Sequence, residues 1–239
     1  MEAVIGTAGW SIPARDAAAF PGEGTALERY SRVFRGVEIN SSFHRRHRAA
    51  TWARWAAAVP EAFRFAVKIP KTITHQAKLV GCEALAEQFA QDVAPLGDKL
   101  AVLLVQLPPK LGFDARVAEA FFTHLRGLTG AQIACEPRNA SWFEAGADAL
   151  LAGLRVARVA ADPAPVAAAA VPGGWPGLAY WRLHGSPVMY RSAYEEEAIA
   201  GYAAQIRTAL AAGRDAWCMF DNTAGSEATA NAMALADRI

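Results

Sequence analysis

Glu136 and Arg138 lie at the end of an apolar segment, with Pro137 between them. A proline favours an extended conformation for the residue before it, so the two charged side chains should leave the strand on the same face. A carboxylate and a guanidinium are costly to bury without partners, and such groups gather at functional sites. Ser141 and Trp142 follow at once. The segment therefore predicts a site, although the charged pair could instead only brace the turn that follows.

Alternating strands and helices must position these groups. Short apolar runs predict strands at 4–10, 36–40, 63–68, 100–106, 133–136, 156–162, 178–184 and 217–222. Helices are predicted at 25–34, around Trp52 and Trp55, at 82–93, from Asp114 to 126, at 143–153, at 195–212 and after Ser226, with a polar loop at 41–48. This rhythm predicts an α/β fold, a single-domain (β/α)8 TIM-like barrel over residues 1–239 with an irregular connection at 163–177 after strand six. A doubly wound open sheet is the alternative.

Barrel enzymes place their sites at the C-terminal ends of the strands, so the strand ends are the informative positions. Most of them are polar or charged: Trp10, Asn40, Lys68, Gln106, Glu136, Asp162, His184 and Asp221-Asn222. Because side chains alternate along a strand, Glu38 and Arg182 should also point inward, one layer deeper. Buried charges require partners. We therefore expect Glu38 and Arg182 to share one buried network with Lys68 and Glu136.

Composition excludes some classes of partner. The formal net charge is +1, which gives no overall attraction to nucleic acid or to anionic membranes. Cys82, Cys135 and Cys218 are widely spaced, which indicates reduced core thiols rather than a disulfide framework. No apolar run approaches the ~20 residues of a membrane span, and no signal peptide is recognised. A cytoplasmic protein is expected, and its oligomeric state is left open.

Nucleotide and hydrolase motifs are missing from the sequence. It contains no phosphate-binding loop ending in Lys-Ser or Lys-Thr, no three-glycine dinucleotide fingerprint, no nucleophile elbow and no His-Glu-x-x-His helix. The reaction therefore cannot be read from a motif.

The strand ends and their neighbours also carry a family resemblance. The chain resembles members of the DUF72 (YecE-like) family along its whole length, through the motifs Gly6-Thr7-Ala8-Gly9-Trp10, Val37-Glu38-Ile39-Asn40-Ser41-Ser42-Phe43, Phe65-Ala66-Val67-Lys68, Ile73-Thr74-His75, Leu104-Val105-Gln106-Leu107-Pro108-Pro109, Glu136-Pro137-Arg138 with Ser141-Trp142, Arg182-Leu183-His184-Gly185, and Phe220-Asp221-Asn222 with Asn231-Ala232. The resemblance implies a TIM-barrel-like fold and no established activity.

The first functional hypothesis is an enzyme that acts by acid-base chemistry on a polar or anionic small molecule bearing a phosphate or carboxylate. Glu136 or Asp162 would be the general base and His184 or His75 the acid. The substrate would be held by Asn40, Lys68, Gln106, Arg138, Trp142, Arg182 and Asn222. The hydrolase, lyase and isomerase classes all remain open. In a glycosidase variant, Trp10, Phe43, Trp142 and Tyr190 would be sugar platforms.

Two other hypotheses compete. In one, Glu136, Asp162, His184 and Asp221 bind a divalent cation in a hydrolase, isomerase or nuclease-like barrel, although no metal ligand set is assigned. The basic loop at 45–48 could then contact nucleic acid, a partner that the overall charge disfavours. In the other, the protein is a ligand-binding module without turnover. Asn40 and Gln106 could equally serve only to bond the backbone at the rim.

Overall fold

The chain forms an α/β structure, described here from a computed structural model for residues 2–239. Its strands are β1 (Val4–Thr7), β2 (Gly36–Ile39), β3 (Arg64–Lys68), β4 (Leu100–Gln106), β5 (Gln132–Glu136), β6 (Val156–Arg158), β7 (Ala160–Asp162), β8 (Gly173–Gly174), β9 (Leu178–Leu183) and β10 (Asp215–Phe220). They make two sheets, one in the order β1-β10-β9-β7 and the other in the order β2-β3-β4-β5-β6-β8. Every pairing is parallel except β6 with β8.

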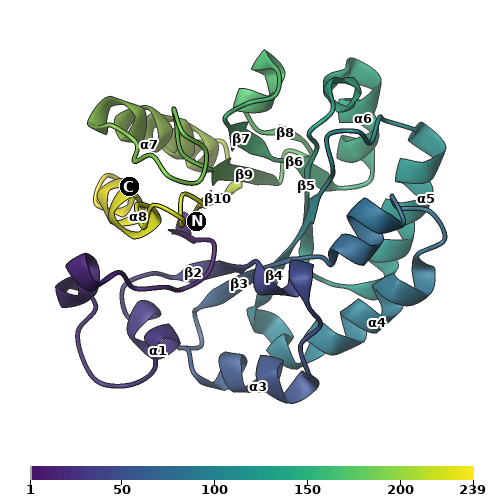
Figure 1. Cartoon of the computed structure of the whole chain (residues 1–239). Coiled ribbons are helices and arrows are strands. Elements are labelled where there is room, and N and C mark those ends of the chain that lie inside the picture. Colours follow the sequence, from purple (N-terminus) through teal and green to yellow (C-terminus); the bar gives the residue numbers. More distant parts are fainter. Residues whose placement is uncertain (1) are drawn as a thin grey trace.

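The two sheets adjoin at both of their ends. A parallel bridge joins Ala8 to Glu38 beyond β1 and β2. At the other end, the predicted sixth strand is split around Val159, so that β6 pairs with β5 while β7 pairs with β9. Figure 1 shows the strands around a common centre with the helices outside them. All eight predicted strand segments exist, and the C-terminal ends of the parallel strands gather on one side.

The helices are α1 (Ala26–Tyr30), α2 (Ser41–His44), α3 (Ala49–Ala57), α4 (Glu83–Val93), α5 (Ala115–Leu128), α6 (Ala145–Gly153), α7 (Glu196–Ala211) and α8 (Ala228–Ala236). Short turns of other helix types are η1 (Ala14–Ala19), η2 (Thr72–Gln76), η3 (Ala94–Lys99), η4 (Ala140–Phe143) and η5 (Ala167–Ala170). Helix α5 illustrates the local rules. Asp114 accepts hydrogen bonds from the backbone of Arg116 and Val117, and the buried residues Ala118, Phe121, Phe122 and Leu125 recur at helical spacing.

The apolar side chains form two cores. The larger one lies between the strands and the helices. The smaller one lies among the inward-facing strand residues and includes Ala66, Ala134, Ala157, Tyr180 and Met219. Alanine recurs on the inner face because little space remains where several strands converge. These small residues leave room for the charged side chains one layer above.

Several predicted boundaries were wrong. The polar segment after β2 is the short helix α2 at its start rather than a loop throughout. The first strand ends at Thr7 instead of Trp10. Ser226 does not cap the last helix: its φ is +63°, and the flanking position of α8 is Glu227, which makes no side-chain cap bond. The irregular connection after strand six is confirmed, with only η5 and the two-residue strand β8 in it.

Within residues 2–239, no helix is both long enough and apolar enough to cross a membrane.

Candidate functional site

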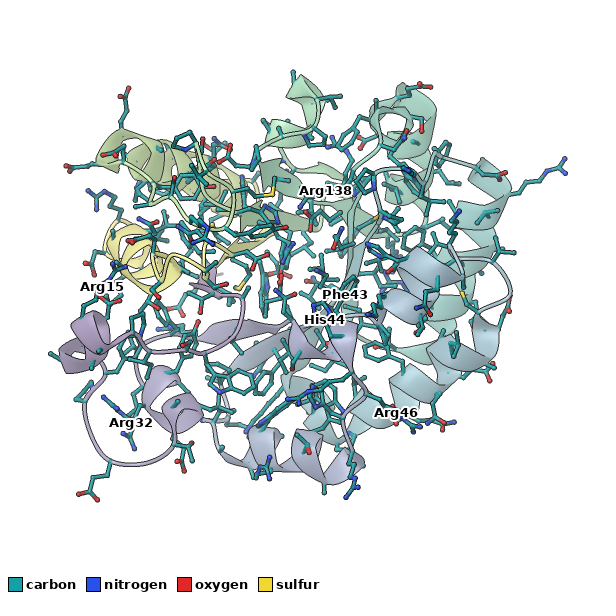
Figure 2. All side chains as sticks on the ribbon, in the orientation of Figure 1. Arg15, Arg32, Phe43, His44, Arg46 and Arg138 are labelled. Atoms are coloured by element: carbon teal, nitrogen blue, oxygen red, sulfur yellow. The ribbon has the colours of Figure 1, made fainter. Side chains whose placement is uncertain are left out.

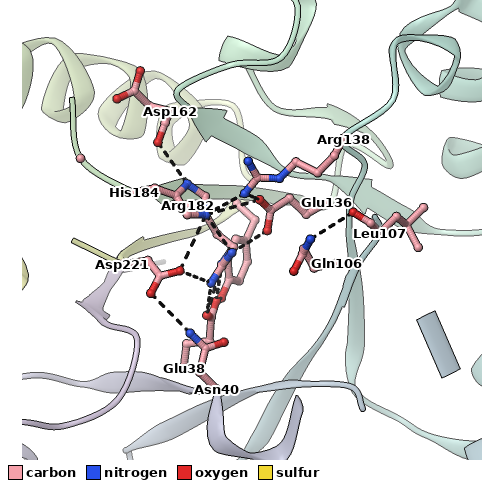
Figure 3. A network of polar contacts seen from close by, with 12 residues as sticks. Glu38, Asn40, Gln106, Leu107, Glu136, Arg138, Asp162, Arg182, His184 and Asp221 are labelled. Carbon is pink, nitrogen blue, oxygen red and sulfur yellow. Dashed lines mark hydrogen bonds and ion pairs between the residues drawn. The ribbon is translucent and has the colours of Figure 1, made fainter. Parts of the chain in front are cut away.

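Arg182 lies at the centre of a buried charge network (Figure 3). Its guanidinium donates from Nε and Nη2 to Glu38 at 2.9 and 2.7 Å, from Nη1 to Glu136 Oε2 at 2.7 Å, and from Nη2 to Asp221 Oδ2 at 2.9 Å. Arg182 is 1% exposed, and Glu38 and Glu136 are fully buried. Strand β9 brings Arg182 to this position because it pairs with β7 on one side and β10 on the other. The predicted network is confirmed for Arg182, Glu38 and Glu136.

Glu38 belongs to the deep layer of this network. Tyr180 donates from Oη to Glu38 Oε2 at 2.9 Å, and Arg182 donates to both carboxylate oxygens, from Nε to Oε2 and from Nη2 to Oε1. Burial, and then the negative charge of Glu38, raise the pKa of Tyr180 well above its ordinary value. These groups are satisfied by one another and sealed from solvent, so the deep layer holds the layer above it in place.

Glu136 is an ionised carboxylate held by two guanidinium groups. Arg138 Nη2 donates to Glu136 Oε1, while Arg182 bonds the other oxygen. Burial alone raises the pKa of Glu136, but Arg182 and Arg138 together bring it well below its usual range. A carboxylate with so low a pKa is a weak base. The expected role of Glu136 as general base is therefore not favoured by its surroundings.

His184 is a neutral imidazole whose tautomer follows from its neighbours. Its Nδ1 lies 3.1 Å from the backbone oxygen of Asp162, so Nδ1 carries the proton and donates it. Its Nε2 faces two donors, Arg138 Nη2 at 2.9 Å and Arg182 Nη1 at 3.0 Å, and must accept. Burial lowers the pKa of His184 to about 3. The negative charge of Glu136 raises this pKa, but the positive charges of Arg182 and Arg138 lower it further. Such a histidine holds no second proton near neutral pH, which disfavours its expected role as an acid.

Asp221 is the carboxyl of the cluster that titrates closest to neutrality. It follows β10 directly, accepts from Arg182 at Oδ2, and lies 3.5 Å through Oδ1 from Asn40 Nδ2. Burial raises the pKa of Asp221 to about 6. The positive charge of Arg182 lowers this pKa by less than burial raises it, and the negative charge of Glu38 raises it further. Sequence reasoning placed Asp221 at a strand end but gave it only a metal-binding role. The signal that was missed is the register of β10 on β9. Phe220 pairs with Leu183, and Asp221, the next residue, lies beside Arg182.

Lys68 lies beside this cluster without an ion pair. Its Nζ is 4.2 Å from the centroid of the Phe43 ring. Within residues 2–239 the Lys68 side chain forms no salt bridge and no hydrogen bond, whereas Glu136 pairs with Arg138 and Arg182. Burial, and then the positive charge of Arg182, lower the pKa of Lys68 to about 8. Lys68 therefore lies near the predicted network but does not pair with Glu136 as expected.

Two further predicted residues lie at the rim. His75 Nδ1 lies 2.8 Å from Thr74 Oγ1, and its ring meets Phe43 edge to face at 5.0 Å. Partial burial, and then the positive charges of Lys68 and Lys71, lower the pKa of His75. Gln106 pairs with Glu136 in the β4–β5 register and donates to the backbone oxygen of its neighbour Leu107.

Three predicted residues face other partners. The carboxylate of Asp162 accepts from Tyr194 Oη at 2.6 Å and is directed away from the network in Figure 3. Asn222 donates to Ser192 O and to Asn231 Oδ1, both at 2.9 Å, and so fastens the loop before α7. Trp142 is 1% exposed and donates from Nε1 to Leu111 O at 3.0 Å. These interactions are bracing contacts that commit each side chain to a partner outside the charge network.

The geometry provides little for a metal site. Within the described residues, no group of three or more His, Cys, Asp or Glu side chains is arranged to hold a metal ion. Of the four ligands considered, Asp162 faces Tyr194, while Glu136 and His184 face guanidinium groups.

Two members of the basic loop at 45–48 are committed to partners within the protein. Arg46 pairs with Asp92, and His47 is buried with its Nε2 2.8 Å from Ser41 Oγ. Figure 2 shows Arg46 at the periphery, while Phe43 and Arg138 lie near the centre. Arg45 and Arg48 are the exposed cations of this loop without such a commitment within residues 2–239, fewer than the four basic residues considered for nucleic acid.

Fold and cluster together define an α/β protein with a charged cluster at the C-terminal ends of its parallel strands. The chain belongs to the DUF72 family, described as a protein of unknown function, whose model matches residues 4–239. It is 34% identical over 151 residues to UPF0759 protein YecE of Escherichia coli K12, and 31% identical over 125 residues to UPF0759 protein YunF of Bacillus subtilis. These matches cover 61% and 49% of this chain and 55% and 44% of the relatives, so they span about half the length of each relative.

Solved structures support the same fold. A DUF72 family protein from Enterococcus faecalis superposes with a TM-score of 0.82 at 20% identity, covering 99% of this chain and 95% of that one. A DUF72 family protein from Thermotoga maritima gives 0.79 at 22% identity, covering 99% and 98%. These likenesses concern the fold alone.

Proposed function

We propose that this chain is an acid-base enzyme that acts on a small anionic substrate at the C-terminal ends of its strands. Its two sheets would form one TIM-like (β/α)8 barrel and a single domain over residues 1–239. The observation that carries the proposal is the pair Asp221 and Lys68, whose pKa values of about 6 and about 8 bracket neutrality within one buried cluster. Groups tuned in this way are suited to proton transfer.

Asp221 is the proposed general acid and base. Its neighbours Glu38 and Glu136 are neutralised by guanidinium groups, so Asp221 is the carboxyl in this cluster that can gain and lose a proton near pH 6. Arg182, Glu136 and His184 are positioning residues in this proposal. They fix the orientation of Arg138 and Asp221 and are not themselves proposed to react.

Arg138 is the proposed anion holder. Its side chain is 13% exposed, and its Nε is buried without a hydrogen-bond partner within residues 2–239. The Oδ1 of Asn40 is likewise a buried acceptor without a donor. Buried polar atoms are rarely left unpaired, and a bound ligand would satisfy both of these. A phosphate or carboxylate matches the guanidinium fork, and a hydroxyl matches the amide oxygen.

The proposal is tested by thermal-shift titration of the protein with a panel of phosphorylated and carboxylated metabolites. We expect at least one anion to raise the melting temperature of the native protein and to leave that of the Arg138→Met variant unchanged. The control is Arg32→Met, a change at the periphery (Figure 2), and the same anion should raise its melting temperature as well. Turnover of that anion should fall by 10²-fold or more in Asp221→Asn, the usual range for loss of an acid-base group. Equal stabilisation in Arg138→Met would contradict the anion site. Binding without turnover would favour the binding-module hypothesis.

A further inference from the structure

Lys68 is a nearly buried amine that forms no close ion pair within residues 2–239, although the more distant Glu136, Glu38 and Asp221 partly offset the effect of its burial. It is 8% exposed, whereas the other buried charges at this end of the fold make close ion pairs. Its Nζ lies on the face of Phe43. The ammonium form loses hydration here, and its cation-π contact with Phe43 and the attraction of the more distant carboxylates do not make up for that loss. The neutral amine, by contrast, loses little in such a place.

The surroundings of Lys68 also supply what an attacking amine requires. Arg182 lies close enough to repel a positive charge on Nζ, and Asp221 close enough for the two groups to shift each other's pKa. The hydrogen bond from Ser42 Oγ to the backbone oxygen of Lys68, at 2.6 Å, fixes the end of β3. The backbone of Lys68 is therefore fixed at the end of the strand, and its amine interacts electrostatically with a carboxyl that can carry a proton.

We infer that Lys68 is a nucleophile that forms a Schiff base with a carbonyl substrate. This inference rests on the proposed function and names its substrate class, a small aldehyde or ketone that also bears a carboxylate or phosphate. Arg138 would hold the anionic group. Lysines that react in this way are generally desolvated or placed beside another cation.

The step balances within the site. The neutral Nζ attacks the carbonyl carbon and forms the C–N bond, while the carbonyl oxygen takes a proton from Asp221. The nitrogen then gives a proton to the Asp221 carboxylate, which passes it to the hydroxyl as the C–O bond breaks and water leaves. A protonated imine remains on Lys68, and Asp221 is left ionised. Hydrolysis reverses the same steps. The imine withdraws electrons from the adjacent carbon, so the bonds to that carbon become easier to break.

Borohydride trapping tests the inference directly. The protein is incubated with pyruvate, with glycolaldehyde phosphate or with propionaldehyde, then reduced with sodium borohydride, digested and analysed by mass spectrometry. We expect at least one anionic carbonyl to leave one reduced adduct on the peptide containing Lys68, at ten-fold or greater yield than propionaldehyde. Lys68→Arg should abolish that adduct. Lys71→Arg, which changes a partly exposed lysine three residues away, should leave it unchanged.

The outcomes separate this inference from the proposed function. If an anion raises the melting temperature through Arg138 but neither anionic carbonyl marks Lys68, the Schiff base is overturned and the anion site stands. Labelling spread over exposed lysines, or retained in Lys68→Arg, also overturns it. If the anion panel and the trapping both fail, the proposed function and the Schiff base fall together. Asp221→Asn should slow trapping by Lys68 at neutral pH without moving the adduct to another residue.

Discussion

At the scale of single residues, the pairing of charges decides which side chains can react. Arg182 and Arg138 hold Glu136 in its ionised form, and burial together with the same two cations keeps His184 neutral. Both residues are strand-end groups of the kind expected to do acid-base chemistry, yet each is committed to a hydrogen-bonded partner. Burial raises the pKa of Asp221 to about 6, because Arg182, its close cationic partner within residues 2–239, offsets only part of the effect.

Arg182→Met is predicted to destabilise the fold strongly. The substitution removes the cation that bonds Glu38, Glu136 and Asp221, and breaking a buried charge pair from one side typically costs 3–5 kcal/mol. The free energy of unfolding, measured by urea denaturation, should fall by about that amount. Arg158→Met is a matched control, because its partner Asp148 is 37% exposed and can be rehydrated. A smaller loss for Arg182→Met than for Arg158→Met would contradict the central role of Arg182.

At the scale of elements, the first two strands must approach closely for the two sheets to adjoin. Gly6 in β1 and Gly36 in β2 lie against each other, and a Cβ built on Gly6 would overlap the carbonyl oxygen of Gly36. The same segment is braced by Tyr30, whose Oη accepts from the backbone nitrogen of Thr7 at 2.9 Å. The glycines therefore serve close packing of backbone on backbone.

Gly6→Ala is predicted to destabilise the protein by about 1–3 kcal/mol, the usual cost of inserting a methyl group into a packed interior. Gly201→Ala is the control. Gly201 lies within α7 with no atom near its missing Cβ, so alanine there should stabilise by about 0.5–1 kcal/mol through helix propensity. Thermal or urea unfolding of the two variants measures the difference. Equal stability of both would mean that β1 and β2 can separate without cost.

At the scale of the whole molecule, folding shifts the pKa values of two groups of the cluster in opposite directions. The folded pKa of His184 is lowered from 6.5 to about 3, so its contribution to stability is present above pH 6.5 and is lost as the pH falls. The folded pKa of Asp221 is raised from 3.8 to about 6, so its contribution is present below pH 3.8 and is lost as the pH rises through 6. Between about pH 4 and 6 the two dependences oppose each other.

Single variants should therefore uncover opposite slopes. Relative to the native protein, Asp221→Asn should lose stability more steeply as the pH falls from 6 to 4, and His184→Gln less steeply. Each difference should approach about 1.4 kcal/mol per pH unit, the value for one proton. Urea unfolding at several pH values measures it. Parallel curves for all three proteins would show that neither group carries the shifted pKa.

The sequence by itself determined the order of strands and helices, the irregular connection after strand six and the inward direction of Glu38, Glu136 and Arg182. These follow from local rules, namely apolar periodicity, caps and the alternation of side chains along a strand. Only the tertiary structure decided that Asp162 turns to Tyr194, that Lys68 rests on Phe43, and that Asp221 rather than Glu136 titrates near neutrality. The reason is that a pKa depends on burial and on charges a few ångströms away, and those charges come from residues far apart in the chain.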